Sequence, residues 1–286
     1  MVDAAARQAG VGVAPLRTGA GWGERLSFDE AESQRDADGQ GPDEAAAPAV
    51  AVQHLPSGAL VDVRGHLSRV AVPAYRAVLQ ALAEEPAAVI CDLSRVTGPA
   101  DADAVALVGS LGAQVRHWPG TPVGVVCPSA DLRRRLQGHR DGQHLALGPR
   151  RAALLSHLAQ TPRPTSIREA FPPVAESVRA ARDLVAHACQ DWGCGVEADA
   201  AMLVVSELVT NALIHAGTGP VMFVARFGSR LRLAVRDGNA RRPQPRKVDP
   251  SHPSGRGMLL VAAMSRAWGV LPTAEGGKVV WAVLDV

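Results

Sequence analysis

The sequence contains few of the features that define several common classes of protein. Its 286 residues include only four cysteines, and no two of them stand in a C-x-x-C pair. A structural zinc site or a disulfide framework is therefore not expected. Neither the G-x-x-x-x-G-K-[ST] pattern nor the G-x-G-x-x-G pattern occurs, so the P-loop and dinucleotide-binding motifs are absent as well.

Charge of one sign and long apolar runs are also missing. Lysine and arginine together number 30 against 28 acidic residues, and no segment reaches the strongly basic balance of a nucleic-acid-binding protein. No apolar run is long enough to cross a membrane, and the N-terminus lacks the regions of a signal peptide. We therefore expect a cytoplasmic protein with no direct nucleic-acid or membrane partner.

Residues 1–160 divide into two parts by composition. Residues 1–47 are rich in Ala, Gly, Asp and Glu without an apolar period, which predicts a disordered acidic arm. Residues 48–160 alternate strand and helix patterns, which predicts an α/β domain with a largely parallel sheet. The predicted strands are 50–54, 59–64, 88–93, 122–127 and 144–147, and the predicted helices are 73–83, 103–115, 130–136 and 149–159.

The second half of the chain follows a different order of elements. A proline-rich stretch predicts a linker at 161–170, and residues 171–286 then predict an α/β sandwich with helices over a mostly antiparallel sheet. The predicted helices are 174–190, one around 206–217 and one at about 257–267; the predicted strands are 221–227, 231–237 and a final pair.

The stretch "SELVTNALIHAG" places Glu207, Asn211 and His215 at i, i+4 and i+8. In a helix these three side chains lie along one stripe. The helix is apolar on nearly all sides, so we expect it to be buried, with partners required for its few polar groups.

Two further features follow this helix. In "RLRLAVRDG" the strand period places Asp237 on the apolar face, where it is mispredicted, paired with an arginine, or recognising a hydrogen-bond donor in a pocket. Taken alone, the arginine pair is favoured. In "SGRGMLLVAAM", Gly255 and Gly257 precede an apolar helix, whose free backbone N–H groups favour a phosphate.

The combination of an E-x-x-x-N-A helix, a strand ending in D-x-G, a variable loop and a G-x-G helix start resembles the Bergerat-fold ATPases. Within them, "FPPVAESVRAARDLVAHACQDWG", "VVSELVTNALIHA", "GRGMLLVAAMSRAWGV" and "GGKVVWAVL" resemble consecutive blocks of the bacterial anti-sigma-factor serine kinases. The resemblance covers about residues 165–286. It implies an ATP-binding serine/threonine-protein kinase that uses Mg²⁺.

The resemblance also implies roles for individual residues. Glu207 would be the general base that accepts the proton of an attacking serine, Asn211 would ligate magnesium, and Asp237 would accept from the adenine amino group. Residues 241–254 would form a lid, and His215 would either touch the ligand or only cap or pack. The implied ATP-binding residues are Asn211, His215, Asp237, Gly238, Gly255, Arg256, Gly257 and Met258.

Residues 50–159 resemble the STAS domain of anti-anti-sigma factors, through "LVDVRGHLSRVAVPAYRAVLQAL" and "AVICDLSRVTGPADADAVALVGSL". Where that family places an Asp and the phosphoacceptor Ser, this sequence has Ala100 and Asp101, and Ser68 stands where an acid is common. The nucleophile is thereby lost and a fixed charge stands at a helix start. Alternatively, Asp101 is only an N-cap.

The resemblance implies a separate STAS-type anti-anti-sigma protein as the substrate, with a sigma factor and a second copy of the chain as further candidate partners. An alternative function is a nucleotide-gated anti-sigma binding protein that sequesters its partner without phosphotransfer. A histidine kinase is disfavoured, because Leu158 replaces the acid expected after His157 and the span to Asn211 is too short for a dimerisation hairpin.

Overall fold

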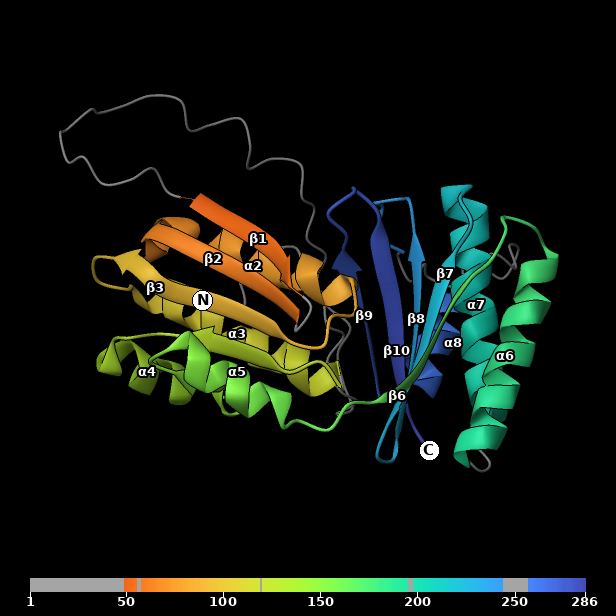
Figure 1. Cartoon of the computed structure of the whole chain (residues 1–286). Helices are drawn as coiled ribbons and strands as arrows, with labels where there is room; N and C mark the ends of the chain where they lie inside the picture. Colours follow the sequence, from red (N-terminus) through yellow and green to blue (C-terminus); the bar gives the residue numbers. More distant parts are fainter. Residues whose placement is uncertain (1–48, 56–57, 119, 195–197, 244–256) are drawn as a thin grey trace, which may run out of the picture.

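The computed structural model describes residues 49–55, 58–118, 120–194, 198–243 and 257–286. These residues form two five-stranded sheets, one in each half of the chain. We call residues 49–159 the N-terminal unit and residues 165–286 the C-terminal sandwich. The predicted arm at residues 1–47 lies outside the described residues. Figure 1 shows the second sheet between the N-terminal unit on one side and a layer of helices on the other.

The N-terminal unit has the sheet order β1-β2-β3-β4-β5. Strands β2 to β5 pair in parallel and β1 pairs antiparallel to β2, as expected for a largely parallel α/β sheet. Its elements are β1 (Ala49–Leu55), β2 (Gly58–His66), α2 (Leu67–Ala83), β3 (Val89–Thr97), α3 (Ala102–His117), β4 (Val123–Val126), α4 (Ala130–Gln137), η1 (Gly142–His144), β5 (Ala146–Gly148) and α5 (Arg151–Ala159).

The C-terminal sandwich has the sheet order β6-β7-β8-β10-β9, and all of its pairs are antiparallel. The predicted fold class, helices over a mostly antiparallel sheet, is confirmed. Its elements are β6 (Thr165–Ala170), α6 (Glu176–Trp192), α7 (Ala198–Ala216), β7 (Val221–Phe227), β8 (Arg230–Asp237), α8 (Gly257–Met264), β9 (Ala267–Pro272) and β10 (Lys278–Asp285).

Several segment predictions differ from the structure. Helix α2 begins at Leu67, six residues before the predicted start at 73 and with Pro73 inside it, and α7 begins at Ala198. Two short segments also differ in type. Thr165–Ala170, inside the stretch expected as a linker, is the edge strand β6 and pairs with β7. The helix expected to reach about Ala267 ends at Met264, and Ala267 begins β9. Both segments are short, and pairing with a neighbouring strand decides their secondary structure. Local residue preferences do not predict such pairing.

Helix α7 is less buried than its composition predicts. Val204, Val205 and Leu208 pack in the core, but Ile214 is 69% exposed and Leu203 is 40% exposed. The sector that contains Glu207 and Asn211 is half-buried. Among the described helices, α7 is the one long and apolar enough to cross a membrane by length and composition, which is weak evidence for a span because it packs against α6, α8 and β8.

Both faces of the second sheet are covered. On β10, Val280, Ala282 and Leu284 face the helices, and the alternate residues Val279, Trp281 and Val283 join the core of the N-terminal unit. One apolar cluster therefore runs from α2 and α3 into the C-terminal sheet (Figure 1). A strand with apolar residues on both faces is typical of a sheet buried from both sides.

Charged residues reinforce this junction. Arg232, 1% exposed, pairs with Glu85, and its guanidinium lies 4.1 Å from the ring centre of Trp118. Trp118 in turn meets Trp281 edge to face, with centroids 5.8 Å apart. Glu85 directly follows the C-cap of α2 and adopts a left-handed φ of 57°. Such a conformation is costly for a residue other than glycine, and here it holds a carboxylate against a buried guanidinium.

Candidate functional site

Helix α7 presents Glu207 to the start of α8. A Cβ added to Gly257 would overlap the Glu207 carboxylate oxygen Oε2. A side chain at this position would force the Glu207 carboxylate to move, so glycine keeps the first turn of α8 in close contact with it. The two elements bring a negative side chain and a helix N-terminus together, although 49 residues separate them in sequence.

Asn211 lies one helical turn beyond Glu207, about 6 Å along the axis. Its side-chain nitrogen Nδ2 is buried and has no hydrogen-bond partner among the described residues. A buried amide without a partner is unfavourable by roughly 1–3 kcal/mol. The group therefore fits a position completed by a ligand.

The same position fits a magnesium ion. The side-chain amide of Asn211 offers oxygen as well as nitrogen, and their assignment depends on the hydrogen-bond network. No cluster of three or more His, Cys, Asp or Glu side chains forms a metal site in the described part of the chain. A magnesium ion bound to phosphate needs few protein ligands, because phosphate oxygens and water fill its other positions. The amide oxygen of Asn211 suits such an ion.

Asp237 ends strand β8 on the helix-facing side and is 5% exposed. Its Oδ1 accepts from Lys278 Nζ at 2.8 Å and from the Asn239 backbone N at 2.8 Å. Its other oxygen, Oδ2, accepts no hydrogen bond from the described residues. The pairing with arginine favoured for this acid is therefore wrong, because the partner is the directly opposed residue of β10, Lys278.

The end of β8 is tied to the end of α7. Asn239 Nδ2 donates to the His215 carbonyl oxygen at 2.6 Å, and the Gly238 backbone N donates to Thr218 Oγ1 at 3.1 Å. The His215 side chain is exposed. These hydrogen bonds connect the end of β8, which carries Asp237, to the end of α7, which carries Asn211. The two parts of the candidate site are therefore held at a fixed distance from each other.

The remaining predicted ATP-binding residues are distributed differently. Gly255 and Arg256, with most of the predicted lid, lie outside the described residues. Met258 is 4% exposed, and its side chain packs in the core of the sandwich and anchors α8 there. The structure thus brings Glu207, Asn211 and Gly257 together.

Asp101 lies in the N-terminal unit as the N-cap of α3. Its Oδ1 accepts from the Ala104 backbone N at 2.6 Å. Hydrogen bonds from the Ser68 side chain and from this backbone N–H lower the pKa of Asp101 below its ordinary value. Helix α3 is about 24 Å long, and its opposite end, at His117 and Trp118, meets the C-terminal sheet.

Comparison with known proteins defines the class of the second half of the chain. Residues 171–284 match the model of the histidine kinase-like ATPase domain. This segment is therefore similar to the ATP-binding domains of the GHKL superfamily, and the match begins directly after β6 and ends within β10. No curated protein matches the chain.

Lys278 was not identified from the sequence as part of this site. It is 4% exposed and donates to the Asn239 carbonyl oxygen at 2.8 Å in addition to Asp237. Its position in the sequence could have identified it, because a lysine at the start of the apolar strand "KVVWAVL" requires a buried partner. Its pairing with Asp237 depends on the strand register, which the sequence alone does not supply.

Proposed function

We propose that the chain is an ATP-dependent serine/threonine kinase and anti-sigma regulator that phosphorylates a STAS-type anti-anti-sigma protein. The observation that carries the proposal is the α7 stripe, where the Glu207 carboxylate lies against the start of α8 and the buried Asn211 amide lacks a protein partner. A carboxylate next to a phosphate position suits transfer to a hydroxyl group.

In the proposed reaction, Glu207 accepts the proton of a serine hydroxyl on the partner. The serine oxygen forms a bond to the γ-phosphorus of ATP, the bond from that phosphorus to the β–γ bridging oxygen breaks, and ADP leaves. A magnesium ion, held by Asn211 and phosphate oxygens, would supply charge neutralisation. The N–H groups at the start of α8 stabilise the phosphate charge.

Adenine recognition is assigned to Asp237. Lys278 and Asn239 occupy Oδ1, which leaves Oδ2 as an acceptor for the adenine amino group. A carboxylate at this position accepts hydrogen bonds and cannot donate one. Guanine carries a carbonyl group in place of that amino group, and Asp237 cannot donate a hydrogen bond to it.

The partner in this proposal is a separate protein, and the N-terminal unit is a STAS-like regulator in the same chain. Two observations support this division. The unit packs on the sheet face opposite to α6, α7 and α8 (Figure 1). Asp101 stands at the helix start with Ala102 beside it, so this position offers no hydroxyl to phosphorylate.

The alternative function, nucleotide-gated binding of a sigma factor without phosphotransfer, shares the ATP site. Exposed apolar side chains on the two helices that carry the site give it a basis: Ile214 on α7 and Met264 on α8 are 69% and 38% exposed. Such side chains suit a protein-binding surface. The two functions differ in whether Glu207 acts on a bound hydroxyl.

The deciding experiment compares Glu207→Gln with wild type in ATP binding and in phosphotransfer to a STAS-type protein. We expect unchanged ATP affinity and a hundredfold to ten-thousandfold slower transfer, the usual contribution of a general base, roughly 10²–10⁴. Glu176→Gln, at an exposed position of α6, is the matched control and should behave as wild type.

Asn211→Ala serves as the second arm of this experiment. It should abolish magnesium-dependent ATP binding, measured by calorimetry, while the far-ultraviolet circular dichroism spectrum stays unchanged. Transfer at the wild-type rate in Glu207→Gln would exclude Glu207 as the general base, and no transfer by the wild-type chain would exclude the kinase function. Wild-type ATP binding in Asn211→Ala would exclude the site itself.

A further inference from the structure

The arginines of β8 that face the N-terminal unit are not all neutralised in the same way. Arg232 pairs with Glu85, and Arg236 pairs with Glu84 at 2.7 Å. Arg230, at the other end of the strand, has no carboxylate partner among the described residues. Its Nη1 donates to the backbone carbonyl oxygen of Arg116 at 3.4 Å.

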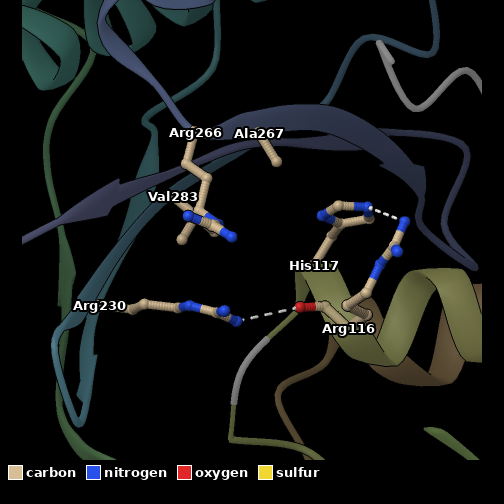
Figure 2. Close-up of a pocket in the computed structure, with 6 residues that line it drawn as sticks. All are labelled: Arg116, His117, Arg230, Arg266, Ala267 and Val283. Carbon is tan, nitrogen blue, oxygen red and sulfur yellow. Dashed lines mark hydrogen bonds between the residues drawn. The ribbon is translucent and has the colours of Figure 1, made fainter. Parts of the chain in front are cut away.

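A pocket lies at this end of the junction. It has an empty volume of about 370 Å³, part of which is open to solvent. Figure 2 shows the guanidinium groups of Arg230 and Arg266 and one ring nitrogen of His117 facing the same space. The pocket is lined by Arg116, His117, Arg230, Arg266, Ala267 and Val283.

The hydrogen bonds of His117 define which of its nitrogens carries a proton. Arg116 Nη2 lies 3.1 Å from His117 Nε2. A guanidinium group can only donate, so Nε2 accepts and the proton of a neutral ring is on Nδ1. Burial, with Arg116 and Arg230 nearby, lowers the pKa of His117 to about 4, so the ring is neutral at neutral pH. Nδ1–H is then a donor directed into the pocket.

The pocket therefore collects donors of three side chains: His117 from α3, Arg230 from β8, and Arg266 before β9. Asp285 is the one carboxylate that pairs with any of them in the described part of the chain, and it meets Arg266 at 3.2 Å. Two guanidinium groups and a neutral N–H donor facing one space match the oxygens of a phosphate, which guanidinium binds in a forked geometry.

We propose that this pocket is a binding site for a phosphate group, on the sheet face opposite to the ATP site and at the junction of the two halves of the chain. The phosphate is either free inorganic phosphate or the phosphoryl end of a small phosphomonoester. It adds, at Arg230, to the neutralisation that Glu85 and Glu84 provide further along β8 at Arg232 and Arg236. Because its donors come from both halves, the bound phosphate stabilises the junction.

The test is thermal unfolding of the full chain without ATP, with increasing inorganic phosphate and with chloride balancing the ionic strength. We expect a saturable rise in Tm with phosphate. Arg230→Gln and Arg266→Gln should each weaken phosphate binding by at least about tenfold, since each removes a charged hydrogen-bond donor. Arg182→Gln, at an exposed position of α6, is the matched control and should keep the wild-type response.

A second arm separates this site from the ATP site. The Tm response to phosphate should persist in Asn211→Ala, and repeating the titration with phenyl phosphate distinguishes the two sources. A larger response to phenyl phosphate assigns the site to a monoester, and a larger response to inorganic phosphate assigns it to the free ion. Equal responses of wild type and both pocket variants, or no response beyond chloride, would overturn the proposal.

Discussion

The two faces of the C-terminal sheet are built from different chemistry. The face under α6, α7 and α8 is mostly apolar, with Leu233 and Val280 typical of it, and the buried pair of Asp237 with Lys278 lies where β8 ends. The face under the N-terminal unit combines apolar residues such as Trp281 with Arg232 and Arg236, whose charges are paired across the junction. The first face depends mainly on apolar burial, with that pair at the end of β8, and the second also requires charges of the two halves of the chain to pair correctly. The second face therefore specifies one docking geometry as well as an apolar contact.

The largest effect on this comparison is expected from Trp281→Ala, which removes a buried side chain from the face under the N-terminal unit. We expect a loss of about 3–5 kcal/mol in the free energy of unfolding. Trp268, on the neighbouring strand, faces the helices and is only partly buried, so Trp268→Ala should cost less. Urea denaturation measures both. A larger loss in Trp268→Ala would show that the junction contributes little to stability.

The next effect concerns charge pairing. Glu85→Gln removes the carboxylate that pairs with the buried guanidinium of Arg232, and we expect a loss of up to about 3 kcal/mol. Glu84→Gln should cost less than about 1 kcal/mol, because Arg236 keeps Glu275 and lies nearer to solvent. The comparison uses chemical denaturation of the two variants under one set of conditions. Equal losses would mean that burial does not distinguish the two ion pairs.

A smaller effect should appear as a pH dependence. The pKa of His117 is lowered to about 4 in the folded chain, against about 6.5 when unfolded. Below pH 6.5 the unfolded chain binds a proton that the folded chain does not. Stability therefore falls as the pH drops through this window, by roughly 2 kcal/mol between pH 7.5 and 4.5. In phosphate-free buffer, His117→Gln should show a correspondingly smaller fall, and an identical fall would remove His117 as the cause.

The smallest effect is expected far from the junction. Asp101→Ala removes the N-cap of α3 and should lower the free energy of unfolding by about 1 kcal/mol. Asp101→Ser restores a capping side chain and should recover most of this loss. Both variants should keep the ATP affinity of wild type, since Asp101 and the candidate site lie on different sides of the sheet. A change in ATP affinity would indicate coupling between these two regions.

The helix period was sufficient to predict the Glu207–Asn211 stripe, because both residues lie on one long helix. It was not sufficient to predict burial, since Leu203 and Ile214 share that sector and are exposed. The partners of Asp237 and Arg232 also escaped prediction. Asp237 meets Lys278 through strand register, and Arg232 meets Glu85 through the packing of two halves of the chain. Both contacts are set by tertiary structure, and residue patterns carry no information about which partner is chosen.

The sequence nevertheless contained an indication that the sheet is covered twice. Strand β10 reads "KVVWAVLD", a continuous apolar run where a half-exposed strand would alternate. The predicted fold placed helices over the sheet and did not say what covers its other face. The apolar residues on the second face of β10 are explained by the N-terminal unit, which no local pattern could place.

The two-sided burial of β10 affects how the chain can be divided. A fragment that began at β6 would contain the C-terminal sandwich but would expose Val279, Trp281 and Val283 to water. Exposed contiguous apolar surface of this kind promotes self-association. Such a fragment is expected to precipitate or to assemble through this face. The two halves are therefore best expressed and engineered together.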